Sequence, residues 1–176
     1  IDTDEVTLTV SGNAQVDDNN KAVYINTDVA GAAVIVESGS TITTTSGDNG
    51  IIADTTTLTD ITNSGTISAN KNKAIDIYRS TNSSITNNSG ATISSVGNTI
   101  RTGGTSGDPS TGYTITNSGK IFSTSTGVKS TVLFGNANSS GGTITNNSGA
   151  EIYSGGNVAT IKVGGTTTIK NRGSIK

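Results

Sequence analysis

The 176-residue chain has no cysteine, histidine, methionine or tryptophan, and it has a single proline. The lack of cysteine excludes disulfides and thiolate metal sites, and it fits a chain that stays uncrosslinked during export. The lack of histidine excludes a Ser-His-Asp triad and histidine metal ligands. Acid–base catalysis would therefore depend on pairs of carboxylates, as it does in glycosidases.

Charge and large apolar side chains are also scarce. Charged residues make up 14% of the chain and the net charge is -2, so the basic stripe that nucleic acids require is missing. No apolar run reaches 18 residues, which excludes a membrane-spanning helix. The hydrophobic fraction of 30% would suit a disordered chain. The isoleucines and valines nevertheless keep a strict phase among serine, threonine, asparagine and glycine, which predicts a fold with a narrow core.

A short motif recurs along the chain: Ile, polar, Asn, Ser, Gly, small, Ile. A short form stands at 61–67 and 115–121, a longer form at 85–93 and 144–152, and a looser copy at 169–175. Its glycines, with two weaker upstream copies, follow one another at steps of 24 to 30 residues: Gly12, Gly39, Gly65, Gly90, Gly119, Gly149 and Gly173. Self-similarity at such a period is typical of a solenoid.

One repeat has room for three short strands and three turns. Within it, isoleucine alternates with threonine, so isoleucine points inward and threonine outward, and the Ser-Gly pair forms a bend where glycine permits a positive φ. We therefore predict an all-β fold: a right-handed, three-sided parallel β-helix of six to seven coils of 24–30 residues, which forms a single segment over residues 1–176. Both ends look cut, so we expect a piece of a longer surface protein.

One asparagine occupies the same phase of five successive repeats. In stacked coils these side chains would lie above one another and bond their neighbours, because a buried amide is tolerable only when it is hydrogen-bonded. Val10 and Val36 take this place in the first two coils. The predicted internal ladder consists of Asn63, Asn87, Asn117, Asn146 and Asn171.

The Ser/Thr/Asn/Gly-rich coil with "ITNSGTI" and "ITNNSGATI" resembles the passenger domains of bacterial type V autotransporters, and it is similar to large filamentous haemagglutinin-type adhesins. The resemblance covers about residues 8–176. It implies a β-helix on the bacterial cell surface or secreted from it, with a membrane-embedded C-terminal β-barrel that is not in these residues. Such passengers include adhesins, aggregation factors, cytotoxins and stalks that carry a separate enzyme.

The outer face of the third strand of each coil is one candidate binding strip. We expect these strands near 23–25, 51–53, 74–78, 100–102, 128–130 and 161–163. One outward residue from each would then align in a column: Tyr24, Ile52, Asp76, Arg101, Lys129 and Lys162. Asp76 and Arg101 would be partners on adjacent coils. A solvated face with a weak ion pair is the alternative interpretation.

Two inserted segments, 103–113 and 134–142, are the other candidates, because binding residues concentrate on loops held by a rigid scaffold. The first contains Asp108 and Tyr113, and the second begins at Phe134. Neutral drift in loop length is the alternative.

Three further features have simple structural explanations. The acids Asp54, Asp60, Asp76, Asp108 and Glu151 occupy different phases, so no catalytic residue is predicted. Residues 17–20 offer clustered oxygens but lack a calcium-loop spacing, so we predict a solvated turn and no metal. A threonine column at positions 62, 86, 116 and 145 is single and ends at Lys170, whereas ice-binding solenoids have paired columns; β-propensity explains it.

These observations favour a non-catalytic, cofactor-free passenger segment that mediates adhesion or bacterial aggregation. Its partners would be a host-cell surface protein or glycan, or other passengers, and no nucleic acid. A passive stalk that presents another domain is the alternative, and a polysaccharide lyase or glycosidase is a distant third.

Overall fold

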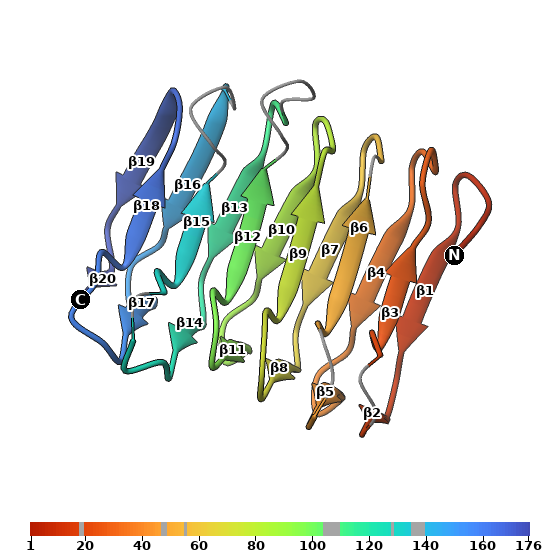
Figure 1. Ribbon diagram of the computed structural model, residues 1–176, viewed down its shortest axis with the longest axis horizontal. Helices are drawn as coiled ribbons and strands as arrows, with labels where there is room; N and C mark the ends of the chain where they lie inside the picture. Colours follow the sequence, from red (N-terminus) through yellow and green to blue (C-terminus); the bar gives the residue numbers. More distant parts are fainter. Residues whose placement is uncertain (18–19, 47–48, 55, 104–109, 128, 135–139) are drawn as a thin grey trace.

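The computed structural model describes residues 1–17, 20–46, 49–54, 56–103, 110–127, 129–134 and 140–176. Within them the chain winds as a right-handed, three-sided parallel β-helix (Figure 1), which confirms the predicted fold. Six complete coils precede two strands of a seventh. This part of the chain contains no helix long and apolar enough to cross a membrane.

Each complete coil gives one strand to each of three parallel sheets, A, B and C. Sheet A contains β1 (Thr7–Val10), β4 (Ala33–Val36), β7 (Asp60–Asn63), β10 (Ser84–Asn87), β13 (Thr114–Asn117), β16 (Gly142–Asn146) and β19 (Thr167–Asn171). Sheet B contains β2 (Asn13–Val16), β5 (Thr41–Thr44), β8 (Thr66–Ala69), β11 (Thr92–Ser95), β14 (Lys120–Ser123), β17 (Glu151–Ser154) and β20 (Ser174–Ile175). Sheet C contains β3 (Val23–Ile25), β6 (Ile51–Asp54), β9 (Ile75–Tyr78), β12 (Ile100–Gly103), β15 (Val132–Phe134) and β18 (Ile161–Val163).

The core consists of aliphatic columns, because equivalent residues of successive coils pair in register. In sheet A, Ile61, Ile85 and Ile115 stack on one another, and each is at most 1% exposed. Sheets B and C carry similar columns through Ile93 and Ile100. Burial of each such side chain contributes about 1.5–3 kcal/mol, so a chain with few large side chains still has a continuous core.

The third strand of the fifth coil was predicted in the wrong place. It was expected at 128–130, but β15 spans Val132–Phe134. Val132 and Phe134 are the inward residues and Leu133 points outward, in register with Arg101 and Lys162. The turn after β14 is longer in this coil than in its neighbours, so a constant offset from the motif glycine misses the strand.

The corner between sheets A and B has two forms that alternate strictly along the helix. A two-residue corner, such as Ser64-Gly65 or Ser118-Gly119, follows β1, β7, β13 and β19. A four-residue corner, such as 88–91 or 147–150, follows β4, β10 and β16. The two forms join by side chains, since Asn88 Nδ2 donates to Ser64 Oγ at 2.8 Å.

The glycines of the two corner forms serve different purposes. Gly39, Gly90 and Gly149 in the long corners have φ near +78°, with open space where a Cβ would stand. Gly65 and Gly119 in the short corners lack a positive φ, but a Cβ there would collide with backbone oxygens of the preceding long corner. The predicted positive φ is therefore confirmed only for the long form.

The corner between sheets C and A contains a second regular feature. A ladder of isolated bridges joins Ala30, Thr57, Thr81, Thr111 and Ser140. The residue after each rung has a positive φ, and the same holds for Glu5 in the first coil; the later members are Gly31, Leu58, Asn82, Gly112 and Gly141. A left-handed residue thus turns the chain into sheet A in every complete coil.

Candidate functional site

The asparagine ladder is present as predicted and is structural. Each Nδ2 donates to the Oδ1 of the next coil at 2.8–2.9 Å, from Asn63 through Asn87, Asn117 and Asn146 to Asn171. The first four are fully buried, and Val10 and Val36 continue the column on the N-terminal side. These amides are occupied inside the helix and are not available to a ligand.

The outer face of sheet C holds the predicted column, with one correction. Register places Tyr24, Ile52, Asp76, Arg101, Leu133 and Lys162 in line. Lys129 is not a member, because it lies exposed in the turn before β15. Tyr24 is 38% exposed, and the ammonium of Lys21 lies 4.8 Å from its ring centroid.

Asp76 is the centre of this face, and it is almost completely buried although it points outward. Arg101 donates two hydrogen bonds to its carboxylate, from Nε to Oδ1 at 2.6 Å and from Nη2 to Oδ2 at 2.7 Å. Lys73 Nζ lies 3.4 Å from Oδ2, and Asn49 Nδ2 donates to the same oxygen at 3.4 Å. A carboxylate with this many donors is part of a built cluster, which a solvated surface pair is not.

A second ion pair lies beside the first. Arg79 donates from Nε and Nη2 to Asp54 at 2.8–3.1 Å. Both guanidinium groups make cation–π contacts with the ring of Tyr78, with Arg79 Cζ at 5.0 Å and Arg101 Cζ at 5.2 Å from the ring centroid. We call Asp54, Lys73, Asp76, Tyr78, Arg79 and Arg101 the sheet C cluster. The cluster contains three cationic side chains and two carboxylates, and each of them forms an ion pair with another member.

Two predicted binding residues belong to the core. Tyr113 and Phe134 are each 2% exposed and meet edge to face at 6.0 Å. The Tyr113 hydroxyl donates to the Ser80 carbonyl at 2.7 Å, and the Phe134 ring covers Gly142, where a Cβ would not fit. The rings fill the interior of the two longest coils, so the prediction of surface contacts for them was wrong. Asp108 and residues 104–109 and 135–139 lie outside the described residues.

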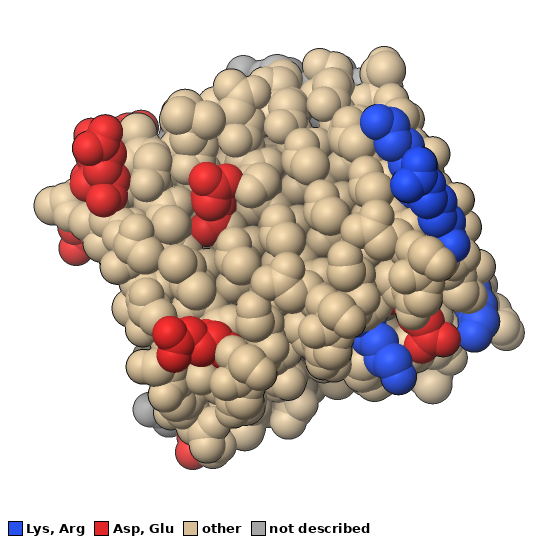
Figure 2. All heavy atoms as spheres, turned by 180° about the vertical axis from the view of Figure 1, so that it is seen from behind, with Lys and Arg blue, Asp and Glu red and all other residues tan. Residues whose placement is uncertain are grey.

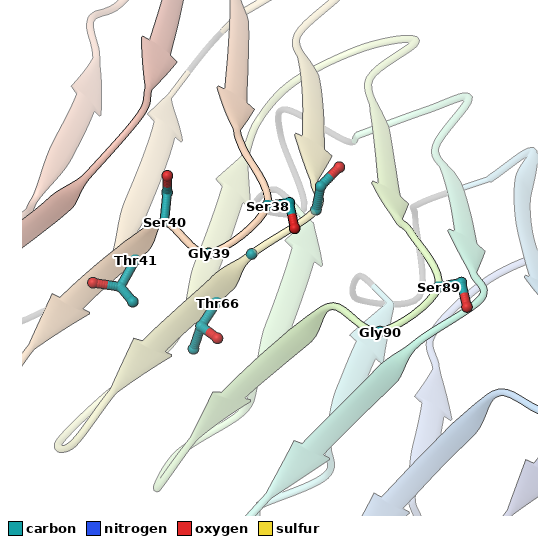
Figure 3. A pocket seen from close by; sticks show the side chains of 9 residues that line it. Ser38, Gly39, Ser40, Thr41, Thr66, Ser89 and Gly90 are labelled. Atoms are coloured by element: carbon teal, nitrogen blue, oxygen red, sulfur yellow. The ribbon is translucent and has the colours of Figure 1, made fainter.

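The alternating corners produce two notches that the sequence did not predict. Each encloses about 290 Å³ where a short corner lies recessed between two long ones. The first is lined by Ser38-Gly39 and Ser89-Gly90 of the two long corners (Figure 3) and by Ser64-Gly65 of the short corner between them. The second repeats this arrangement over Ser118-Gly119. Both are lined mainly by hydroxyls and backbone, the second also by Lys120, and the lining of neither includes an acid.

Sheet B carries an aromatic pair that the sequence analysis missed. Phe122 and Tyr153 are register neighbours whose rings stack at 4.8 Å, nearly parallel. Partial burial raises the pKa of the Tyr153 hydroxyl, and the charge of Glu151 adds to this, so the pair is uncharged at neutral pH. Each ring directly follows the last isoleucine of its motif copy, Ile121 or Ile152, and this shared place was the signal that would have found the pair.

The described residues contain no group of three potential metal ligands among histidine, cysteine, aspartate and glutamate. Asp17 is exposed and accepts hydrogen bonds from Thr45 and Gln15, which lower the pKa of its carboxyl. Asp54 and Asp76 occupy different phases, as expected, because Asp54 pairs in register with Tyr78 and Asp76 with Ile52, but both lie on the outer face of sheet C. An arginine binds each of these carboxylates with at least two hydrogen bonds.

No protein-family model, no curated protein and no solved structure matches the chain.

Proposed function

We propose that the chain is a non-catalytic segment of a bacterial surface passenger that mediates adhesion or bacterial aggregation through the outer face of sheet C. One observation supports this above the others: on the outer face of sheet C, two arginine–aspartate pairs are held together around one tyrosine ring, and Asp76 is almost completely buried there. A stalk that only spans distance has no need for such an asymmetric face.

The chemistry of the sheet C cluster suits a polar partner. Arg101 uses Nε and Nη2 on Asp76, and a guanidinium has five N–H donors, so donors remain for hydroxyl or carboxylate groups of a ligand. Because the cluster is held by ion pairs and ring contacts, little side-chain entropy is lost on contact. Host glycans, host surface proteins and neighbouring passengers all present such groups, and many copies on one cell would add avidity.

Two other functions receive less support. The outer face of sheet A is mostly uncharged and repetitive, which suits a stalk, but the sheet C cluster has no role in one. A glycosidase would need two carboxylates that face the substrate, whereas Asp54 and Asp76 are each bound by an arginine side chain.

The test is to display residues 1–176 on a non-adherent bacterium and to measure clumping and attachment to epithelial cells. An equal-length regular β-helix is the reference. Tyr78→Ser with Arg79→Ser should lower attachment at least about tenfold, the scale of one interface hot spot, while Thr43→Ser with Thr66→Ser on sheet B should not. Attachment no greater than the reference would favour the stalk.

A further inference from the structure

The outer face of sheet A carries a second column, mostly of hydroxyl side chains, beside the single threonine column that was predicted. The predicted column runs through Thr62, Thr86, Thr116 and Thr145. Two residues earlier on the same strands, a second outward column runs through Asp60, Ser84, Thr114, Thr143 and Thr168. The fourth, fifth and sixth coils therefore present hydroxyl pairs side by side, so the objection that the column is single no longer holds.

The threonine hydroxyls of this face are not used by the protein. In the described part of the chain, no side-chain hydrogen bond involves Thr86, Thr114, Thr116, Thr143 or Thr145, whereas on sheet B the Thr43 hydroxyl bonds that of Ser68. Ser84 is bound to Asp60 at 2.5 Å, at the border of the array. The remaining hydroxyls keep their full hydrogen-bonding capacity for a partner outside the molecule.

The array is regular in two directions. Register neighbours lie about 4.8 Å apart along the helix axis, and residues two apart on a strand lie roughly 6.6 Å apart. Threonine is stiff at χ1, so its methyl and hydroxyl keep their positions. The strands run side by side with little twist (Figure 1), and the asparagine and isoleucine columns beneath hold them in register. The face is a rigid, nearly rectangular lattice.

The lack of charge on this face indicates which kind of partner it can bind. Between Asp60 and Lys170 both outward columns are uncharged, and Figure 2 shows this side of the molecule as a broad neutral area between acidic groups and a basic edge. A neutral face complements a neutral partner, which disfavours nucleic acid and anionic lipid. The two columns also lack the aromatic rings on which sugars stack.

We propose that this face of sheet A binds ice. Crystalline water is a neutral, flat and periodic partner, and its surface oxygens repeat at distances close to those of the array. The methyl groups order the adjacent water, and the hydroxyls hydrogen-bond to it at fixed positions. Because the array is already rigid, little further ordering of the protein opposes binding. This activity is independent of the proposed adhesion, which uses sheet C.

The test uses the 176-residue chain and ice itself. Ice is grown slowly from a dilute solution, the protein incorporated is measured, and the growing crystal is watched for faceting. We expect enrichment in ice at least about tenfold above an inert protein of similar size. Thr86→Lys with Thr116→Lys should abolish the enrichment, because lysine breaks the lattice and brings charge.

The matched control places the same charges on sheet B, with Thr41→Lys and Thr66→Lys, and should keep the enrichment. Circular dichroism and melting temperature establish that both variants fold. If the unchanged chain is excluded from ice like the inert protein, or if both lysine variants lose enrichment equally while folded, the proposal is wrong. Loss of ice binding with attachment retained would separate this proposal from the adhesion proposal.

Discussion

The asparagines show how one residue type holds a whole corner together. Asn117 Nδ2 reaches Asn146 Oδ1 at 2.9 Å and the Glu151 carbonyl at 3.0 Å, and its Oδ1 accepts from Asn87 at 2.8 Å. Asn63 stands at the end of the ladder, with Val36 on its other side. The same side chain therefore has a different environment at the middle and at the end.

Replacement of these asparagines by valine should show that difference. Asn117→Val leaves buried partners on both sides unpaired and should cost about 2–4 kcal/mol of unfolding free energy. Asn63→Val extends the natural Val10–Val36 column and loses one ladder bond, so it should cost about 1–2 kcal/mol. Urea unfolding of the two variants measures both values. Equal losses would contradict a ladder whose members depend on both neighbours.

Leu58 is the weakest point of the left-handed corner. Its φ is +55° and its side chain is 52% exposed, so it is strained without burying much surface. Leu58→Gly should stabilise the chain by up to about 1 kcal/mol and raise the melting temperature by roughly 2–4 °C. Gly141→Ala makes the opposite change at an equivalent position with φ +71°, and this control should lower the melting temperature. A fall for Leu58→Gly would refute the strain.

At the level of elements, the two corner forms react differently to the loss of a glycine. A Cβ on Gly119 would lie 2.6 Å from the Asn88 carbonyl oxygen and closer still to that of Ala91, so Gly119→Ala should cost roughly 2–4 kcal/mol. Gly90 has open space, and Gly90→Ala should cost only about 1 kcal/mol for its positive φ. Thermal denaturation of the pair tests this ranking, and a reversed order would contradict it.

The sequence could predict the elements that repeat in both spacing and residue type. Isoleucine phase placed the strands of sheets A and B, and the asparagine spacing placed the ladder. The left-handed corner was hidden, because Glu, Gly, Leu and Asn all occupy it. The β15 strand was missed because turn length varies.

The candidate sites were harder to predict than the fold. Asp76 and Arg101 were paired correctly because their strands keep a constant offset from the motif. Tyr113 and Phe134 were assigned to the surface because they flank long insertions, and only the packing shows that longer coils need larger rings inside. Pair formation between corners of different coils, which creates the notches, involves contacts that no single repeat contains.

At the level of the whole molecule, the structural unit is a pair of coils. Each long corner lies over a short one, and Asn88 and Asn147 bond the serines of the preceding short corners at 2.8–2.9 Å. Because solenoid coils contact only their neighbours, deletions test this directly.

Deletion of residues 60–83 removes one coil and places two long corners in contact, so Asn88 loses Ser64. Deletion of residues 60–113 removes two coils and restores a short corner after a long one. We expect the larger deletion to melt at the higher temperature, although it removes more of the core. Calorimetry of the two shortened chains decides, and a higher melting temperature for the single-coil deletion would contradict the pair as the unit.

The alternation of short and long corners also constrains how a gene that encodes such a β-helix can change in length. Recombination between repeats an even number of coils apart joins compatible corners, whereas recombination across an odd number joins two of the same form. Viable descendants should therefore gain or lose coils in twos, and the parity of the coil count between two fixed landmarks would be inherited even as total length drifts.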